Sequence, residues 1–106
     1  MNRKPFVKLL KSSSRFKRII GNSRIKKGLC SGFVTLKKGE SIGAHSTCKK
    51  EELLVIIDGF GKAIIGRKTI SIKKGQVLYI PAYSLHDIKN TSGGLLKYLY
   101  ITATAI

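Results

Sequence analysis

Apolar and polar residues alternate along most of this chain in short runs that are separated by turn residues. Such runs, with a period of two residues, predict β-strands. In the last two thirds of the chain the predicted strands cover residues 32–36, 41–47, 52–57, 62–65, 69–72, 77–80, 86–89 and 95–103. No segment sustains the period of a helix, so the pattern predicts an all-β chain. Many short strands joined by tight turns favour a sandwich or a barrel over an open sheet.

The first twenty residues fit more than one structure. Their apolar residues fall near helical spacing, but three consecutive serines from Ser12 interrupt this pattern. Two short strands over residues 6–10 and 16–20 explain the same residues, and we favour them because an N-terminal strand can pair with the edge of a barrel. A weak strand is predicted over residues 25–29. The lack of acidic residues and the presence of arginine and serine also fit an organellar transit peptide, which is the less favoured interpretation.

A length of 106 residues predicts a single domain with a modest core. The hydrophobic content of 42% favours a folded chain over a disordered one. The longest apolar run, residues 53–57, is too short to cross a bilayer, and no cleavage site of a secretory signal follows the basic N-terminus. We therefore expect a cytoplasmic protein with no membrane partner, divided into a basic N-terminal segment (residues 1–31) and a barrel (residues 32–106).

The positive charge is concentrated near the N-terminus. The chain has 21 Lys and Arg against five Asp and Glu, a formal net charge of +16. Twelve of the basic residues and none of the acidic ones lie in residues 1–39. Such a segment attracts nucleic acid, an anionic surface or an acidic partner. We favour a solvated lysine-rich surface over a nucleic-acid role, because no zinc finger, helix-turn-helix or aromatic-stacking signature accompanies the charge.

The two cysteines, Cys30 and Cys48, are expected to be reduced thiols, since nothing in the sequence indicates an oxidising compartment. A less favoured alternative gives Cys48 a role as a soft metal ligand.

Two compact motifs bring histidine, glutamate and glycine together at fixed spacings. In the first, Gly39, His45, Thr47, Glu52 and Gly59 are separated by five, one, four and six residues. This arrangement resembles the first motif of the cupins, in which a second histidine is usual where Thr47 stands.

The second motif consists of Gly75, Pro81, Tyr83, His86 and Asn90, and it resembles the second cupin motif, with Tyr83 where a glycine is usual. Fifteen residues separate the motifs, as in a minimal single-domain cupin. The resemblance covers about residues 32–102. It implies an antiparallel double-stranded β-helix, or jelly-roll barrel, and metal ligands at His45, Glu52 and His86.

Strand geometry supports this candidate site. Residues two apart share a face, so if His45 points into the barrel, Thr47 does too, and Glu52 is followed by inward apolar residues. Two imidazoles and one carboxylate suit a divalent Fe, Mn, Zn or Ni ion, and they leave coordination positions open. Thr47 is expected to hydrogen-bond a metal-bound water, and the pocket is expected to include Tyr83, Tyr98 and Tyr100.

Three functions are compatible with these residues. The favoured one is a small metal-binding cupin, either an enzyme acting on a small molecule or a protein without catalytic activity. The second is a non-catalytic module that binds or senses a small ligand. The third is a polyanion-binding protein that uses the basic N-terminal segment. The resemblance and the need to cover edge strands also predict a homodimer.

Overall fold

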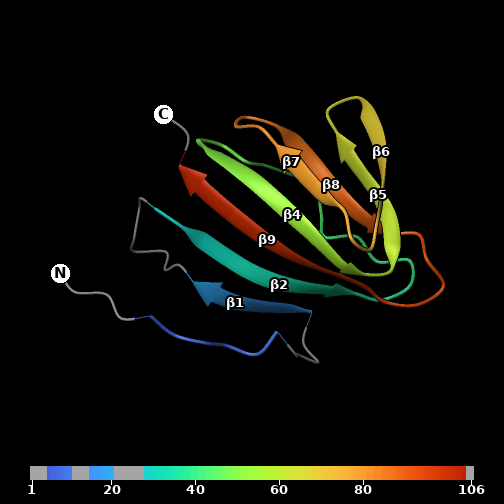
Figure 1. Ribbon diagram of the computed structural model, residues 1–106. Helices are drawn as coiled ribbons and strands as arrows, with labels where there is room; N and C mark the ends of the chain where they lie inside the picture. The colour runs from blue at the N-terminus through green and yellow to red at the C-terminus, as the bar shows by residue number, and fades with distance from the viewer. Residues whose placement is uncertain (1–4, 11–14, 21–27, 105–106) are drawn as a thin grey trace.

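The computed structural model describes residues 5–10, 15–20 and 28–104, which contain nine β-strands and no helix (Figure 1). The strands form two antiparallel sheets. One sheet has five strands in the order β1-β2-β9-β4-β7, and the other has four in the order β3-β8-β5-β6. The strands are β1 (Phe16–Ile20), β2 (Cys30–Leu36), β3 (His45–Ser46), β4 (Lys50–Asp58), β5 (Phe60–Ile65), β6 (Lys68–Lys73), β7 (Val77–Ile80), β8 (Leu85–Asn90) and β9 (Leu96–Thr104). The predicted all-β jelly-roll architecture is confirmed.

The strand predicted over residues 41–47 is wrong in its length. Strand β3 covers only His45 and Ser46, and Ser41 forms an isolated bridge with Lys89. Gly43 adopts a φ of 104°, a left-handed conformation that a regular strand does not contain. The chain therefore bends before His45 and reaches the second sheet at a new angle.

The N-terminal segment joins the edge of the five-stranded sheet. Strand β1 coincides with the strand predicted over residues 16–20, and it pairs antiparallel with β2. The strand predicted over residues 6–10 is wrong, because these residues have no strand structure and are linked to β1 through lysines. Lys8 Nζ donates to Ile19 O at 2.9 Å, and Lys17 Nζ donates to the main-chain oxygen of residue 9 at 3.0 Å. Most of the strand predicted over residues 25–29 lies outside the described residues.

The core lies between the two sheets. Its fully buried side chains alternate along the strands with side chains on the outer faces, as the period of two predicts. Each buried leucine or isoleucine stabilises the fold by about 1.5–3 kcal/mol relative to an exposed one. The largest of these side chains are Leu36, Leu54, Ile56, Ile80, Ile88 and Leu96.

Gly59, the last residue of the first motif, joins β4 to β5 in a space that only glycine fits. Its φ is 79°, and a Cβ atom would lie 2.2 Å from the main-chain oxygen of Leu95. A side chain at this position would push β9 away from the turn. The motif glycine therefore serves the barrel rather than the site.

Within the described residues both cysteines are free. No helix in this part of the chain is long and apolar enough to span a membrane.

Candidate metal centre

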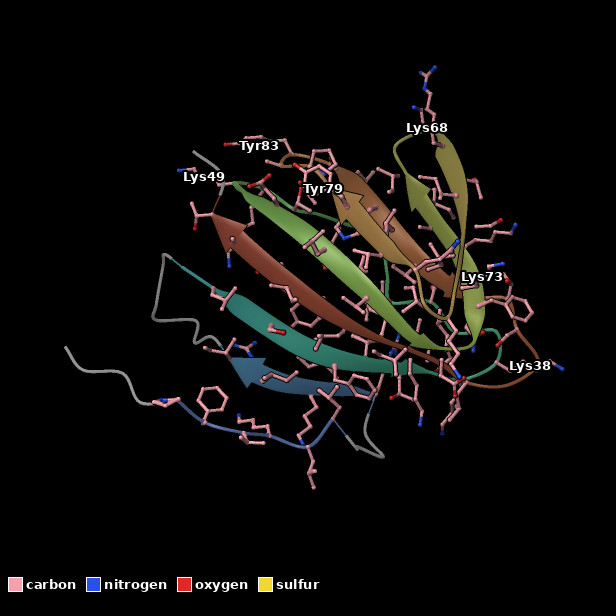
Figure 2. All side chains as sticks on the ribbon, viewed as in Figure 1. Lys38, Lys49, Lys68, Lys73, Tyr79 and Tyr83 are labelled. Atoms are coloured by element: carbon pink, nitrogen blue, oxygen red, sulfur yellow. The ribbon has the colours of Figure 1, made fainter. Side chains whose placement is uncertain are left out.

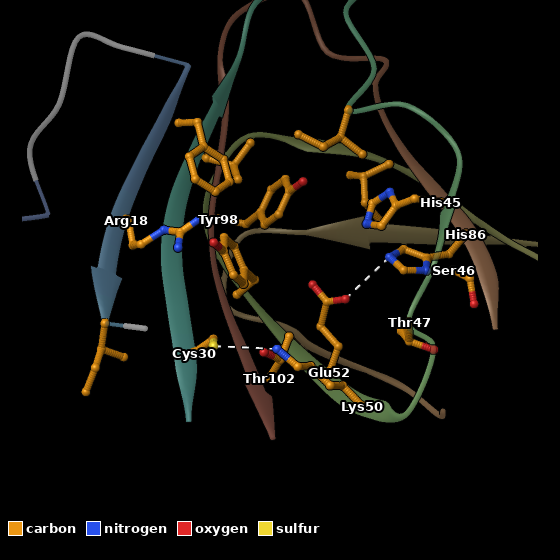
Figure 3. A pocket seen from close by; sticks show the side chains of 16 residues that line it. Arg18, Cys30, His45, Ser46, Thr47, Lys50, Glu52, His86, Tyr98 and Thr102 are labelled. Atoms are coloured by element: carbon orange, nitrogen blue, oxygen red, sulfur yellow. Dashed lines mark hydrogen bonds and ion pairs between the residues drawn. The ribbon is translucent and has the colours of Figure 1, made fainter. Parts of the chain in front are cut away.

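His45, Glu52 and His86, far apart in the sequence, meet at one end of the space between the sheets (Figure 3). One potential ligand atom from each lies within 4.8 Å of the other two. His45 and His86 are direct partners in the β3–β8 register, with ring centroids 4.2 Å apart. Glu52 approaches from β4 of the opposite sheet, and its Oε1 lies 3.3 Å from His86 Nε2. The convergence predicted from the two motifs is present.

Backbone carbonyls fix the orientation of both imidazoles. His45 Nδ1 lies 2.8 Å from Gly43 O, and His86 Nδ1 lies 3.1 Å from Ser84 O. A carbonyl oxygen only accepts hydrogen bonds, so Nδ1 carries the proton in each ring. In the neutral form Nε2 then has the free lone pair that a metal ligand needs. This arrangement is typical of metal-binding histidines, and the three residues fit a divalent ion.

Two further polar residues, Asp87 and Thr47, hold these carbonyls in place. Asp87 Oδ1 accepts a hydrogen bond from Gly43 N at 3.0 Å, so it fixes the residue whose oxygen orients His45. Asp87 directly follows His86 on β8, so its side chain points to the other face of the strand. It does not line the cavity, but its position supports the site from the other face of β8.

Thr47 stands at the usual position of a second motif histidine, and its hydroxyl bonds to main-chain groups. It is buried beside the triad and lines the same cavity. Its hydroxyl donates to Pro81 O at 2.8 Å and accepts from Ser84 N at 3.0 Å. The single hydroxyl proton is therefore used within the protein, and Thr47 ties the loop before β8 to β3.

The environment of His86 favours its charged form. Burial alone lowers the pKa of His86, but the hydrogen bond to Glu52, the bond to Ser84 O and the charges of Glu52 and Asp87 together outweigh it. The net effect raises the pKa of His86 above its ordinary value. In the absence of metal, the Glu52 carboxylate and the His86 ring therefore stabilise each other.

A cavity of about 500 Å³ opens beside the triad. His45 is exposed at this opening, whereas His86 is buried and Glu52 is only 9% exposed. Tyr98 and Tyr100 line the cavity, in agreement with their predicted places. Gly32 makes room for Tyr100, because a Cβ atom there would lie 2.4 Å from the ring.

Tyr83 does not line this cavity. Its side chain is 74% exposed and lies at the edge of the molecule (Figure 2). Its φ is 55°, a left-handed conformation, which explains why glycine is usual at this motif position. Cys48 is also outside the cavity and the triad, so the structure gives no support to Cys48 as a ligand.

Among the cavity residues that the sequence did not predict, three have ionisable side chains. Arg18 comes from β1, Cys30 begins β2 and Lys50 begins β4. None is a marked position of either motif, and Arg18 reaches the cavity because β1 pairs with β2 at the edge of the sheet. For Arg18 the sequence does hold a signal, because Phe16, Arg18 and Ile20 alternate along β1 and so share one face of the strand.

Residues 32–102 match the model of the cupin domain family, the region that the motifs predicted. The chain belongs to the cupin family. Solved structures agree with this assignment at the level of the fold. A Bacillus halodurans protein superposes with a TM-score of 0.84 at 19% identity, over 97% of this cupin and 83% of the other chain.

Two further structures are similar. A cupin family protein with a double-stranded β-helix fold from Methanocaldococcus jannaschii has a TM-score of 0.79 at 17% identity, over 94% of this chain and 91% of that one. A cupin domain from Schizosaccharomyces pombe has a TM-score of 0.76 at 19% identity over 84% of this chain, and the match spans only 63% of the S. pombe chain. Comparison with curated protein sequences gives no significant match.

Proposed function

We propose that this cupin binds one divalent metal ion through His45, Glu52 and His86, and that it uses the adjoining cavity for a small molecule. The observation that carries the proposal is the convergence of the three side chains, with both histidines oriented by backbone carbonyls. Nitrogen and carboxylate donors of this kind suit Fe, Mn, Zn or Ni.

Three protein ligands leave coordination positions for solvent or for a ligand, and a metal held in this way supplies Lewis acidity or an oxygen-binding centre. The residues of the chain would position the small molecule and exclude water from the inner part of the site. Glu52 and His86 lie at the inner side of the site, and exposed His45 lies at the mouth. A small molecule entering by the mouth would therefore meet His45 first and the buried pair last.

The alternative is a module that binds or senses a small ligand without changing it. The same cavity and the same triad support both functions, because neither requires a further reacting group. Incubation of the metal-loaded protein with a ligand, followed by mass spectrometry of that ligand, distinguishes them. An altered ligand indicates an enzyme, and an unaltered one indicates a binding module.

Elemental analysis of protein purified without chelator and without a histidine tag tests metal binding. We expect close to one equivalent of a transition metal in the wild type. His86→Ala should abolish bound metal while the circular dichroism of the β-sheets stays unchanged. Glu52→Gln and Glu51→Gln form a matched pair, because Glu51 accepts a hydrogen bond from the Tyr79 hydroxyl outside the triad. Of these two variants, only Glu52→Gln should lower the metal content. An equal metal content in the wild type and all three variants would refute the assignment.

The predicted partners and location stay proposals. A homodimer is supported by exposed apolar side chains on β4 and β7, among them Leu53, Val77 and Tyr79. Sedimentation equilibrium tests it. A cytoplasmic location is tested by microscopy of a tagged chain.

A solvated basic surface stays favoured over polyanion binding. The labelled lysines Lys38, Lys49, Lys68 and Lys73 are exposed on different parts of the molecule (Figure 2). Because these four lysines are spread in this way, they do not form one continuous basic stripe. Salt-dependent retention on heparin, compared with a chain lacking residues 1–20, tests the polyanion alternative.

A further inference from the structure

Strand β1 forms one wall of the cavity. Phe16, Arg18 and Ile20 line it, whereas the alternate residues Lys17 and Ile19 do not. This division is the two-residue alternation of a strand that lies over the edge of the sheet. Strand β1 precedes the region that matches the family model, so this wall comes from a part of the chain outside that match.

Arg18 brings a positive charge to the cavity. Its side chain extends from β1 toward the inside of the cavity, on the side where Tyr98 lies (Figure 3). Within the described part of the chain Arg18 forms no ion pair, and the carboxylate of Glu52 is paired with His86. A guanidinium presents five donors in a planar fork that matches a carboxylate or a phosphate. Because Arg18 is exposed, these donors are open to a ligand from solution.

Lys50 adds a second positive charge to the cavity from β4 of the same sheet, with β2 and β9 between β1 and β4. Its Nζ lies 3.6 Å from Cys30 Sγ, a weak and uncharged acceptor, so the charge of the ammonium is not neutralised by this contact. Arg18 and Lys50 together outweigh the single carboxylate of Glu52 among the lining residues. A cavity with an excess of one charge raises the local concentration of ions of the opposite sign.

Apolar and aromatic residues from several elements also line the cavity. The rings of Phe16 and Tyr100 lie 5.6 Å apart, and Val34, Ile42 and Ile88 continue the surface. Burial raises the pKa of Tyr98 well above its usual range, with the charges of Glu52 and Asp87 adding to the effect, and burial also raises the pKa of Tyr100. Both phenols therefore stay protonated and can donate a hydrogen bond to an anion.

We propose that the cavity takes an organic anion with an apolar body, and that Arg18, assisted by Lys50, binds its anionic group. The apolar body would lie against Phe16 and Tyr100, and the free end of the molecule would face the triad. This inference rests on the proposed small-molecule function and names the class of the ligand. It does not require the metal, because the cationic and apolar groups belong to the chain.

Benzoate and benzyl alcohol are suitable probes, because they match in size and differ in charge. Each is titrated into the metal-free full chain, and the dissociation constant is measured by ligand-observed NMR, which detects millimolar binding. We expect benzoate to bind at least about tenfold more tightly than benzyl alcohol, the contribution of one charge-assisted hydrogen bond. Benzoate binding that is absent, or no tighter than that of benzyl alcohol, would overturn the proposal.

The matched pair Arg18→Gln and Lys17→Gln distinguishes an effect of the cavity arginine from an effect of the net charge of the protein. Both remove one positive charge from β1, but only Arg18 lines the cavity. Arg18→Gln should weaken benzoate binding about tenfold and leave benzyl alcohol unchanged, whereas Lys17→Gln should leave both close to the wild type. Equal losses in the two variants would mean that only the net charge matters, and would overturn the proposal.

Two outcomes separate this proposal from metal binding. If benzoate binds as expected and elemental analysis finds no metal, the anion site stands and the metal site fails. If metal is present and Arg18→Gln has no effect on benzoate, the metal site stands and the anion site fails. Near-ultraviolet circular dichroism of each variant verifies that the fold is intact.

Discussion

Thr47 and Ser84 are joined by two hydrogen bonds, and through them Thr47 controls the position of His86. The Ser84 N–H donates to Thr47 Oγ1 at 3.0 Å, and the Thr47 N–H donates to Ser84 O at 3.1 Å. Ser84 O is also the oxygen that orients His86 Nδ1. The residue that replaces the usual histidine thus acts on the site through the backbone.

Thr47→Val tests this relationship, because valine has a similar shape and lacks the hydroxyl. The variant leaves Ser84 N and Pro81 O without their hydroxyl partner, so Ser84, whose carbonyl orients His86, is held less firmly. We expect metal affinity to fall about 10–100-fold, as for other residues that orient a ligand. The free energy of unfolding should fall by about 1–3 kcal/mol. Thr47→Ser keeps the hydroxyl and should retain most of the affinity, and both are measured by calorimetric titration of the metal-free protein. Equal affinities for the two variants would contradict this role.

Asp87 is expected to act on His45 in the same manner. Asp87→Ala removes the acceptor for Gly43 N, so the carbonyl that holds His45 Nδ1 is less well fixed. Metal affinity should fall about tenfold. In Asp87→Asn the side-chain oxygen can still accept the bond, and the affinity should lie near the wild type. A loss in Asp87→Asn as large as in Asp87→Ala would point to the charge of Asp87 rather than to its hydrogen bond.

The His86–Glu52 pair should make the stability of the metal-free protein depend on pH. Because the pKa of His86 is raised in the folded state, folding is favoured when His86 is protonated. This contribution is fully present below the ordinary histidine pKa of about 6.5 and is lost as the pH rises through the raised pKa. In chelator, the Tm difference between the wild type and Glu52→Gln should therefore be larger at pH 6 than at pH 8.5. Glu51→Gln controls for the charge change, and a difference that grows with pH would contradict the pairing.

Tyr83 occupies a backbone conformation that suits glycine, and its exposed side chain contributes little packing. A left-handed conformation costs a residue with a Cβ about 1 kcal/mol. Tyr83→Gly should therefore be about 1 kcal/mol more stable than Tyr83→Ala in urea unfolding. Metal content should be unchanged in both variants. A Tyr83→Ala protein as stable as Tyr83→Gly would show that the backbone is not strained at this position.

The fold and the triad were predictable because the patterns that identify them lie within short stretches of the sequence. The spacing from Gly39 to Gly59 and from Gly75 to Asn90 identified the family, and alternation correctly placed Leu54 and Ile56, the apolar residues that follow Glu52, inside the barrel. The bend at Gly43 was missed because a single glycine does not show whether a strand continues through it.

The remaining parts of the site depend on contacts between distant segments. The sequence could not show that Thr47 bonds Ser84, because that bond joins residues 37 positions apart. Arg18 was counted with the basic segment, since only the pairing of β1 with β2 turns it toward the cavity. Tyr83 was expected in the pocket from its place in the motif, whereas its left-handed backbone directs it outward.

The most direct test of the metal site is a crystal structure of the metal-loaded protein, with diffraction data collected on both sides of the absorption edge of the bound metal. The anomalous difference map should show one peak within bonding distance of Nε2 of His45, Nε2 of His86 and the Glu52 carboxylate, about 2.0–2.2 Å for a zinc-like ion. A map without a peak among these three side chains, or with its only strong peak at another position, would contradict the account.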